Sequence, residues 1–238
     1  MGKPNLVSKW PSAAALSALR PSEYTAALIQ VLRMRRECVR GARVLEVGCG
    51  SGVALGVLGT LGAASLCGID IEEDAVVSTL ALLAELGHDE ASEVHRGNMW
   101  LPVAGRRFEL VVANLPHFPL ERADMPGRLP TWSAGGHDGR RLLDPFLAGL
   151  ADHLAPEGRA FITHNAFVDL ERSRTILADA GLQLGIVSTT MVYIPEEKVA
   201  RMNGAILAAE QGRSIHCYGR YAFAEMHIAE IARPGALG

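Results

Sequence analysis

The sequence is poor in aromatic residues and has neither a long hydrophobic run nor a large excess of one charge. Phe, Trp and Tyr together make up 5% of the 238 residues, while hydrophobic residues make up 49% and charged residues 21%. This balance is typical of a folded globular protein and excludes both a disordered chain and a small disulfide-rich one. A chain of this length can bury a substantial core.

Cysteine is also scarce, and its spacing matches neither a disulfide framework nor a zinc site. No two histidines stand four residues apart, as metal ligands on one face of a helix would, so the sequence predicts no metal. We expect the four cysteines to be reduced and mostly buried; they are Cys38, Cys49, Cys67 and Cys217.

No stretch is long and apolar enough to cross a bilayer, and the N-terminus lacks the apolar core of a signal peptide. We therefore expect a cytoplasmic protein with no membrane partner. The formal net charge of −3 gives no overall positive field, so nucleic acid is not favoured as a partner. The sequence leaves the oligomeric state open.

Short apolar runs alternate with longer amphipathic stretches, which predicts a parallel sheet covered by helices on both faces. The expected strands are Val44–Val47, Ser65–Ile69, Glu93–His95, Glu109–Ala113 and Ala160–Thr163, and two later alternating runs, Leu182–Thr190 and Tyr218–Glu230, suit an antiparallel pair. The expected helices are Ser22–Cys38, Val53–Leu61, Glu73–Leu86, Arg141–Leu154, Leu170–Ala180 and one within Pro195–Gly212. No linker or repeat divides the chain, so we expect one domain over residues 1–238, with a helical segment at 1–40.

Three glycines follow the first expected strand, in the spacing Glu46-x-Gly48-x-Gly50-x-Gly52. Glycines between a strand and a helix allow a tight turn and a close approach of a ligand to the backbone. The amides at the start of the helix favour an anionic group. A dinucleotide site would need its third glycine one place later, where Val53 stands, so the spacing indicates another ligand.

This run resembles motif I of the class I S-adenosylmethionine-dependent methyltransferases. The resemblance implies a Rossmann-like, doubly wound, mostly parallel seven-stranded sheet with helices on both faces, and S-adenosylmethionine as the cofactor. The glycine turn would hold the methionine part. Asp70 ends the second strand and would accept the ribose hydroxyls, although an isolated acid there more often caps a helix. The residues that the resemblance assigns to the cofactor are Glu46, Gly48, Cys49, Gly50, Gly52, Asp70, Ile71, Asn98, Met99 and Asn114, with Ile71 against the adenine and Asn98 and Met99 at its amino edge.

The fourth expected strand ends in Asn114-Leu115-Pro116-His117, which resembles the Asn-Pro-Pro-Tyr motif of amino-methylating enzymes. In that motif the asparagine oxygen and the next backbone carbonyl accept the two hydrogens of an –NH2 group, so that its lone pair faces the methyl group. The resemblance implies catalytic roles for Asn114, Pro116 and His117. His117 stands where an aromatic ring would stack on the acceptor, and it can stack, hydrogen-bond or act as a base. A simple turn that ends the strand is the alternative.

Two further segments, Leu19-Arg20-Pro21-Ser22-Glu23 and Ala134-Gly135-Gly136-His137-Asp138-Gly139, resemble the HemK/PrmC group of protein glutamine N5-methyltransferases. The resemblance runs from about Ser17 to Ala180. The short front of the chain leaves no room for the separate helical recognition domain of release-factor methyltransferases, so we expect a different substrate.

The residues favour methyl transfer to an amide or amine nitrogen of a small molecule or protein side chain. Two alternatives stay open: an intramolecular cyclase that releases methylthioadenosine, and a cofactor-binding scaffold without catalysis. The polar end of the fifth strand, Thr163-His164-Asn165, can line the site or form a local cap. The inserted segment 193–212, which begins at Tyr193, is a possible lid or a surface helix.

Overall fold

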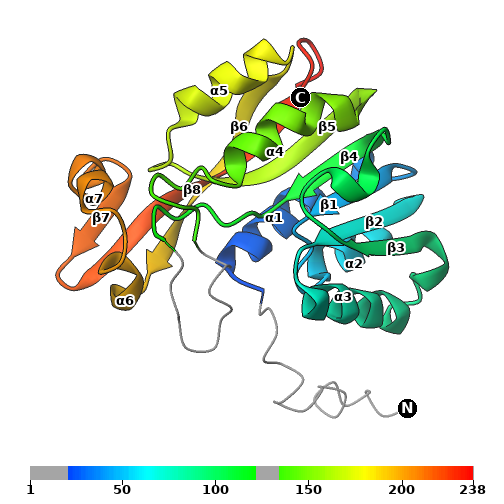
Figure 1. Cartoon of the computed structure of the whole chain (residues 1–238), viewed down its shortest axis with the longest axis horizontal. Coiled ribbons are helices and arrows are strands. Elements are labelled where there is room, and N and C mark those ends of the chain that lie inside the picture. The colour runs from blue at the N-terminus through cyan, green and yellow to red at the C-terminus, as the bar shows by residue number, and fades with distance from the viewer. Residues whose placement is uncertain (1–20, 122–133, 238) are drawn as a thin grey trace.

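The fold is seen in a computed structural model that describes residues 21–121 and 134–237. The strands form one sheet in the order β3-β2-β1-β4-β5-β8-β6, and β7 pairs with the outer part of β8 (Figure 1). The first five strands run parallel, and they are β1 (Arg43–Val47), β2 (Ser65–Asp70), β3 (Ser92–Arg96), β4 (Phe108–Ala113) and β5 (Leu154–Asn165). This arrangement confirms the predicted doubly wound sheet.

Helices cover both faces of the sheet, as the alternation of strands and helices predicts (Figure 1). On one face α1 packs against α2, and α2 packs against α3; on the other face α4 packs against α5. The helices are α1 (Glu23–Met34), α2 (Val53–Thr60), α3 (Glu73–Glu85), α4 (Leu143–His153) and α5 (Leu170–Asp179). The central strands β1 and β4 are buried almost throughout, as expected for parallel strands between two helical layers.

Two antiparallel strands, β8 (Tyr221–Ala232) and β6 (Gln183–Ile194), complete the main path, and β8 lies between β5 and β6. The antiparallel pair matches the expectation, but the strand predicted from Tyr218 begins at Tyr221. Tyr218 instead ends a short strand that was not predicted, β7 (Ile215–Tyr218). The reason is a two-residue hairpin turn, in which Gly219 adopts a φ of +62°. The alternation of apolar and polar side chains continues across so short a turn, so the sequence pattern does not reveal where β7 ends and β8 begins.

The helix predicted within Pro195–Gly212 consists of two short helices, α6 (Glu196–Val199) and α7 (Gly204–Glu210). Asn203 separates them, because its side chain accepts a hydrogen bond from Ala205 and caps α7. The first helix is also shorter than expected: α1 ends at Met34 and a 3-10 turn, η3 (Arg36–Cys38), follows it. Residues 1–20 of the predicted N-terminal segment lie outside the described residues.

The cysteines are free, but only two of them are buried. Cys49 and Cys67 lie in the core, Cys38 is half-buried, and Cys217 is exposed on the edge strand β7. The expectation that most are buried therefore fails at Cys217, whose strand pairs on one side only. Among the described residues, no helix combines the length and apolar character needed to cross a membrane.

Candidate active site

A cavity lies at the carboxyl ends of β1, β2 and β4, where open α/β sheets place their ligands. Strand register explains the convergence, because Val47 at the end of β1 pairs with both Ile69 and Ala113. The loops after all three strands therefore open at one sheet edge. The predicted site residues that line the cavity are Glu46, Gly48, Cys49, Gly50, Asp70, Ile71, Asn98, Met99, Asn114 and Pro116, whereas Gly52 and His117 do not line it.

The glycine turn depends on backbone conformations that favour glycine. Gly48, Gly50 and Gly52 have φ values of +74°, +54° and +74°. A Cβ atom at Gly52 would lie 2.8 Å from the backbone Cα of Thr79 on α3. Gly52 therefore serves the close packing of α2 on α3, while Gly48 and Gly50 face the cavity.

Asp70 ties the end of β2 to the glycine turn. Its Oδ2 atom accepts a hydrogen bond of 2.9 Å from the Gly50 amide, and its Oδ1 atom accepts one of 3.0 Å from the Glu72 amide. The second contact is a local turn bond just before α3, whose N-cap is Glu72, so Asp70 is not the helix cap that the sequence offered as an alternative; the first contact is a long-range bond. Because each carboxylate oxygen has a further lone pair, both atoms keep capacity for a ligand. Burial raises the pKa of this carboxyl.

Glu46 lies deeper, at the base of the cavity. Only 4% of its surface is exposed, and its Oε2 atom accepts a hydrogen bond of 3.2 Å from the Leu55 amide of α2. Burial raises the pKa of the Glu46 carboxyl to about 8, and the neighbouring charge of Asp70 adds to this rise. Glu46 thus holds the start of α2 against β1.

The cavity rim carries an exposed apolar residue and a strained one. Ile71 is 58% exposed although it is apolar, and it follows directly after Asp70. Met99 has a φ of +51°, and it is the one non-glycine residue with positive φ in the described part of the chain. Such conformations are uncommon outside glycine and often occur at binding sites. Gly97, Asn98 and Met99 line the same wall.

The Asn114 side chain is held from both sides. Its Oδ1 atom accepts a hydrogen bond of 2.8 Å from the Thr163 hydroxyl on β5, and its Nδ2 atom donates one of 3.3 Å to Thr25 Oγ1 on α1. Sequence reasoning noted Thr163 only as part of a polar strand end, and it missed Thr25. No local signal marks either residue, because they lie 49 and 89 residues from Asn114.

His117 is buried behind the cavity wall. Only 3% of its surface is exposed, and its ring meets Tyr24 edge-on at 5.8 Å. Its Nδ1 atom lies 2.5 Å from the Leu115 carbonyl oxygen, and its Nε2 atom has no hydrogen-bond partner among the described residues. Burial lowers the pKa of His117 to about 4, so the ring is neutral near pH 7. A stacking or basic role for His117 stays a prediction that this position does not favour.

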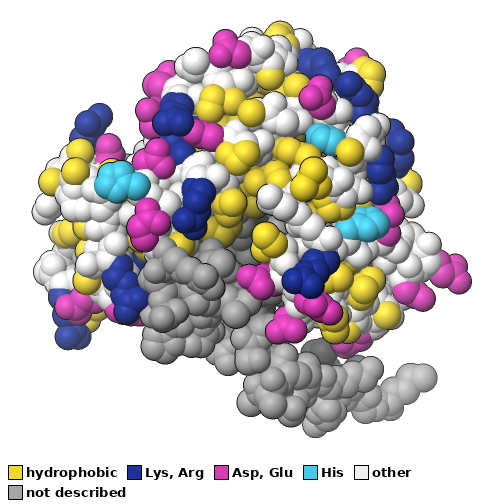
Figure 2. Space-filling model, in the orientation of Figure 1, with side chains coloured by type: hydrophobic (Ala, Val, Ile, Leu, Met, Phe, Trp, Pro, Cys, Tyr) yellow, Lys and Arg dark blue, Asp and Glu magenta, His cyan; other side chains and the backbone are white. Residues whose placement is uncertain are grey.

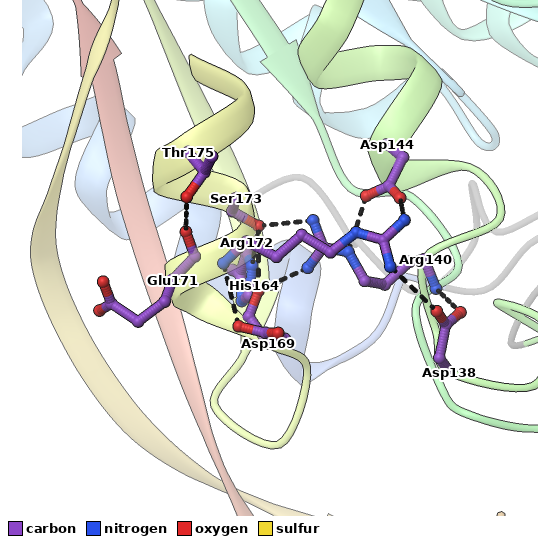
Figure 3. Close-up of polar contacts among 9 residues, drawn as sticks. All are labelled: Asp138, Arg140, Asp144, His164, Asp169, Glu171, Arg172, Ser173 and Thr175. Atoms are coloured by element: carbon purple, nitrogen blue, oxygen red, sulfur yellow. Dashed lines mark hydrogen bonds and ion pairs between the residues drawn. The ribbon is translucent and has the colours of Figure 1, made fainter. Parts of the chain in front are cut away.

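A second polar cluster fastens the segment 134–142 to β5 and α5 (Figure 3). Arg140 is 3% exposed; it donates to Asp144 at 2.7 Å and to the Ser173 hydroxyl at 3.0 Å. Ser173 lies 2.9 Å from His164 Nε2, and Arg172 pairs with the other oxygen of Asp144. Burial lowers the pKa of His164 to about 3, so the cluster holds a neutral histidine. None of the nine residues drawn in Figure 3 lines the cavity.

The inserted segment 193–212 packs beside the Asn114 turn but contributes no residue to the cavity wall. The Lys198 ammonium lies 3.9 Å from the centre of the Phe118 ring. Asn203 donates its backbone amide to the Pro119 carbonyl and its side-chain amide to the His137 carbonyl. Tyr193, 43% exposed, contacts Tyr221 and Phe223 instead of the cavity. A lid role for the segment stays a prediction.

Within the described ranges, one group of side chains has the composition of a metal site, although the sequence predicts no metal. Atoms of Cys67, Glu93 and His95 lie within 4.8 Å of one another on β2 and β3. Arg106 is already hydrogen-bonded to Glu93, whose other oxygen lies 3.1 Å from His95. The Arg106 guanidinium therefore already supplies a positive charge beside the Glu93 carboxylate.

Charged side chains of both signs are interspersed on the face seen in Figure 2, and no single-sign patch dominates it. This distribution agrees with the small net charge of the chain.

Comparison with known proteins finds methyltransferases similar to this chain. Residues 44–129 match the family model described as a methyltransferase domain. Over 152 residues the chain is 32% identical to a release factor glutamine methyltransferase from Gloeobacter violaceus, a match that covers 60% of this chain and 52% of that protein. Over 125 residues it is 30% identical to a ribosomal protein uL3 glutamine methyltransferase from Bradyrhizobium diazoefficiens. This match covers 49% of this chain and 38% of that protein. The chain thus spans about half the length of the first relative and less of the second.

Solved structures show the same fold. A putative RNA methyltransferase from Pyrococcus horikoshii superimposes with a TM-score of 0.60 at 17% identity, over 94% of this chain and 90% of that one. At this identity the likeness concerns the fold alone. The sequence matches lead to one conclusion: residues 44–129 match a methyltransferase domain, and the chain resembles the class I S-adenosylmethionine-dependent methyltransferases, among them the protein glutamine methyltransferases.

Proposed function

We propose that the protein transfers the methyl group of S-adenosylmethionine to an amide or amine nitrogen of a small molecule or protein side chain. The observation that carries this proposal is the position of Asn114 and Leu115. They line the same cavity as the glycine turn and Asp70, and they carry a side-chain and a backbone oxygen that can accept hydrogen bonds.

The residues around the cavity fit the cofactor of the family. Gly48 and Gly50 line the cavity without a side chain, so that a ligand can approach the backbone of the turn closely. Asp70 would accept the ribose hydroxyls, because its carboxylate oxygens keep lone pairs beside their bonds to the Gly50 and Glu72 amides. Ile71 offers an exposed apolar surface for the adenine, with Asn98 and Met99 beside it.

The acceptor nitrogen would be oriented by two oxygen atoms, Oδ1 of Asn114 and the backbone carbonyl of Leu115. Accepting both hydrogens of an –NH2 group fixes its plane and directs its lone pair, and such positioning accounts for much of the rate in transfer reactions. S-adenosylmethionine supplies a methyl carbon on a positively charged sulfur, which becomes a neutral thioether when the nitrogen takes the methyl group and gives up a proton. The names of the curated relatives make a glutamine side chain the first acceptor to test.

The test is incubation of the purified chain with methyl-labelled S-adenosylmethionine and a panel of acceptors, namely glutamine-containing peptides, lysine-containing peptides and a metabolite extract. We expect S-adenosylhomocysteine together with a labelled amide or amine. Release of methylthioadenosine without a labelled acceptor would contradict the proposal and favour the cyclase. Cofactor binding by calorimetry with no nucleoside product on any acceptor would favour the scaffold.

A further inference from the structure

Both oxygen acceptors assigned to the acceptor nitrogen already receive a hydrogen bond from the protein. The Thr163 hydroxyl donates to Asn114 Oδ1 at 2.8 Å. The ring of His117 bonds to the Leu115 carbonyl oxygen at 2.5 Å. A carbonyl oxygen has two lone pairs, so each acceptor keeps one for a ligand.

The chemistry of the contact assigns the proton of His117. A carbonyl oxygen only accepts, so the Nδ1 atom that faces Leu115 must carry the hydrogen. Burial keeps the ring neutral, which leaves Nε2 as a bare acceptor. That atom is buried and forms no hydrogen bond of ordinary geometry in the described part of the chain, and the Asn165 side chain is a polar neighbour that interacts with the ring. The contact of Nδ1 with the Leu115 carbonyl is therefore the hydrogen bond that fixes the ring.

We propose that Thr163 and His117 are positioning residues, which hold the Asn114 and Leu115 oxygens in the orientation that receives the acceptor nitrogen. This inference rests on the proposed function, because it concerns the same two acceptors. His117 then acts through the Leu115 carbonyl and does not itself touch the acceptor.

Asn114 is contacted at both ends of its side-chain amide. Its nitrogen donates to Thr25 on α1, while its oxygen accepts from Thr163 on β5. The neighbouring residue Tyr24 donates its hydroxyl to Asn165 Oδ1 at 2.8 Å, and this bond joins α1 to β5. Two elements far apart in the chain therefore hold the Asn114 turn. Helix α1 contributes Tyr24 and Thr25, and strand β5 contributes Thr163 and Asn165.

Paired substitutions separate positioning from stacking at His117. His117→Asn keeps an amide N–H close to the place of Nδ1, whereas His117→Phe keeps a ring and removes the donor. We expect His117→Phe to lower kcat about tenfold or more and His117→Asn to lower it much less, with S-adenosylmethionine affinity retained in both. The opposite order, with Phe active and Asn inactive, would overturn the proposal in favour of stacking.

Thr163 has its own matched pair. Thr163→Val removes the hydroxyl and should lower kcat about tenfold to hundredfold, while Thr163→Ser should restore most of the rate. Thr60→Val is the control, because it deletes a hydroxyl that bonds to the Gly56 carbonyl at 2.9 Å on α2, away from β5. Equal losses in Thr163→Val and Thr163→Ser would contradict a role for the hydroxyl.

A measurement without an acceptor distinguishes failure of this inference from failure of the proposed function. Nitrogen-15 NMR of the histidine rings, assigned by comparison with His117→Asn, should show His117 as the neutral tautomer with its hydrogen on Nδ1. A hydrogen on Nε2 would overturn the role of His117 even in an active enzyme. If no acceptor is methylated but the Nδ1–H tautomer is found, and Thr163→Val shifts the Asn114 side-chain amide signal, the positioning contacts stand and the proposed reaction fails.

Discussion

The glycine turn after β1 and the Asn114 turn after β4 lie in the same cavity but are built in different ways. The glycine turn relies on backbone conformation, with positive φ at Gly48, Gly50 and Gly52, and its main side-chain contact comes from Asp70 at the end of the adjacent strand. The Asn114 turn relies on side-chain hydrogen bonds. Thr163 and Thr25, which lie 49 and 89 residues from Asn114 in the sequence, hold its side chain.

The difference indicates which part of the site tolerates change. A glycine turn whose amides are fixed by backbone and Asp70 contacts forms a rigid cradle, which suits a cofactor of invariant shape. The Asn114 turn is oriented by side chains from β5 and α1, so its geometry can be tuned for a particular acceptor without disturbing the cradle. We therefore expect substitutions in the two regions to affect different measured quantities.

The largest effect is expected for Asn114→Ala. The variant loses the oxygen that orients the acceptor nitrogen, so turnover should fall about 10²-fold to 10³-fold. Calorimetric affinity for S-adenosylmethionine should change little, because the glycine turn and Asp70 are intact. A parallel loss of cofactor affinity would show that the two regions are not separable.

The reciprocal change is Asp70→Ala, which should weaken S-adenosylmethionine binding about tenfold to hundredfold by removing a charged hydrogen-bond acceptor. Asp74→Ala is the matched control, since Asp74 is an exposed acid in the first turn of α3. Unchanged affinity of the Asp70 variant in calorimetry would exclude the ribose assignment and leave Asp70 with its structural bonds to the Gly50 and Glu72 amides.

A smaller effect, on stability, is expected for Gly52→Ala. Gly52 and Gly87 both have a φ of +74°, but a Cβ atom at Gly87 meets nothing within 4 Å, while one at Gly52 lies 2.8 Å from Thr79. Gly87→Ala should therefore cost only the left-handed strain, about 1–2 kcal/mol of unfolding free energy. Gly52→Ala should cost about 1–3 kcal/mol more, because the clash displaces α2 from α3.

Chemical denaturation of the two glycine variants measures this difference, and calorimetry should show weaker cofactor binding for Gly52→Ala only. Equal stabilities would mean that the close contact with Thr79 relaxes without cost. That outcome would remove the packing role assigned to Gly52.

The sequence alone predicted the parallel half of the sheet and the convergence of Gly48, Gly50 and Asp70 on one cavity. Period, glycine spacing and strand ends are local signals, and the order of strands brings Gly48, Gly50 and Asp70 to one edge without further information. The sequence did not predict the β7 hairpin or the division between α6 and α7. A two-residue turn and a single capping asparagine leave the pattern of apolar and polar side chains almost unbroken.

Only the tertiary structure decided how the Asn114 turn is held. His117 was expected to face the acceptor from its place in the motif, but the fold buries it and turns its Nδ1 atom to Leu115. Thr163 and Thr25 reach Asn114 from β5 and α1 because β5 pairs with β4 and α1 packs against β5 on one face of the sheet. Contacts of this kind depend on which distant elements become neighbours, and no local pattern in the chain encodes that.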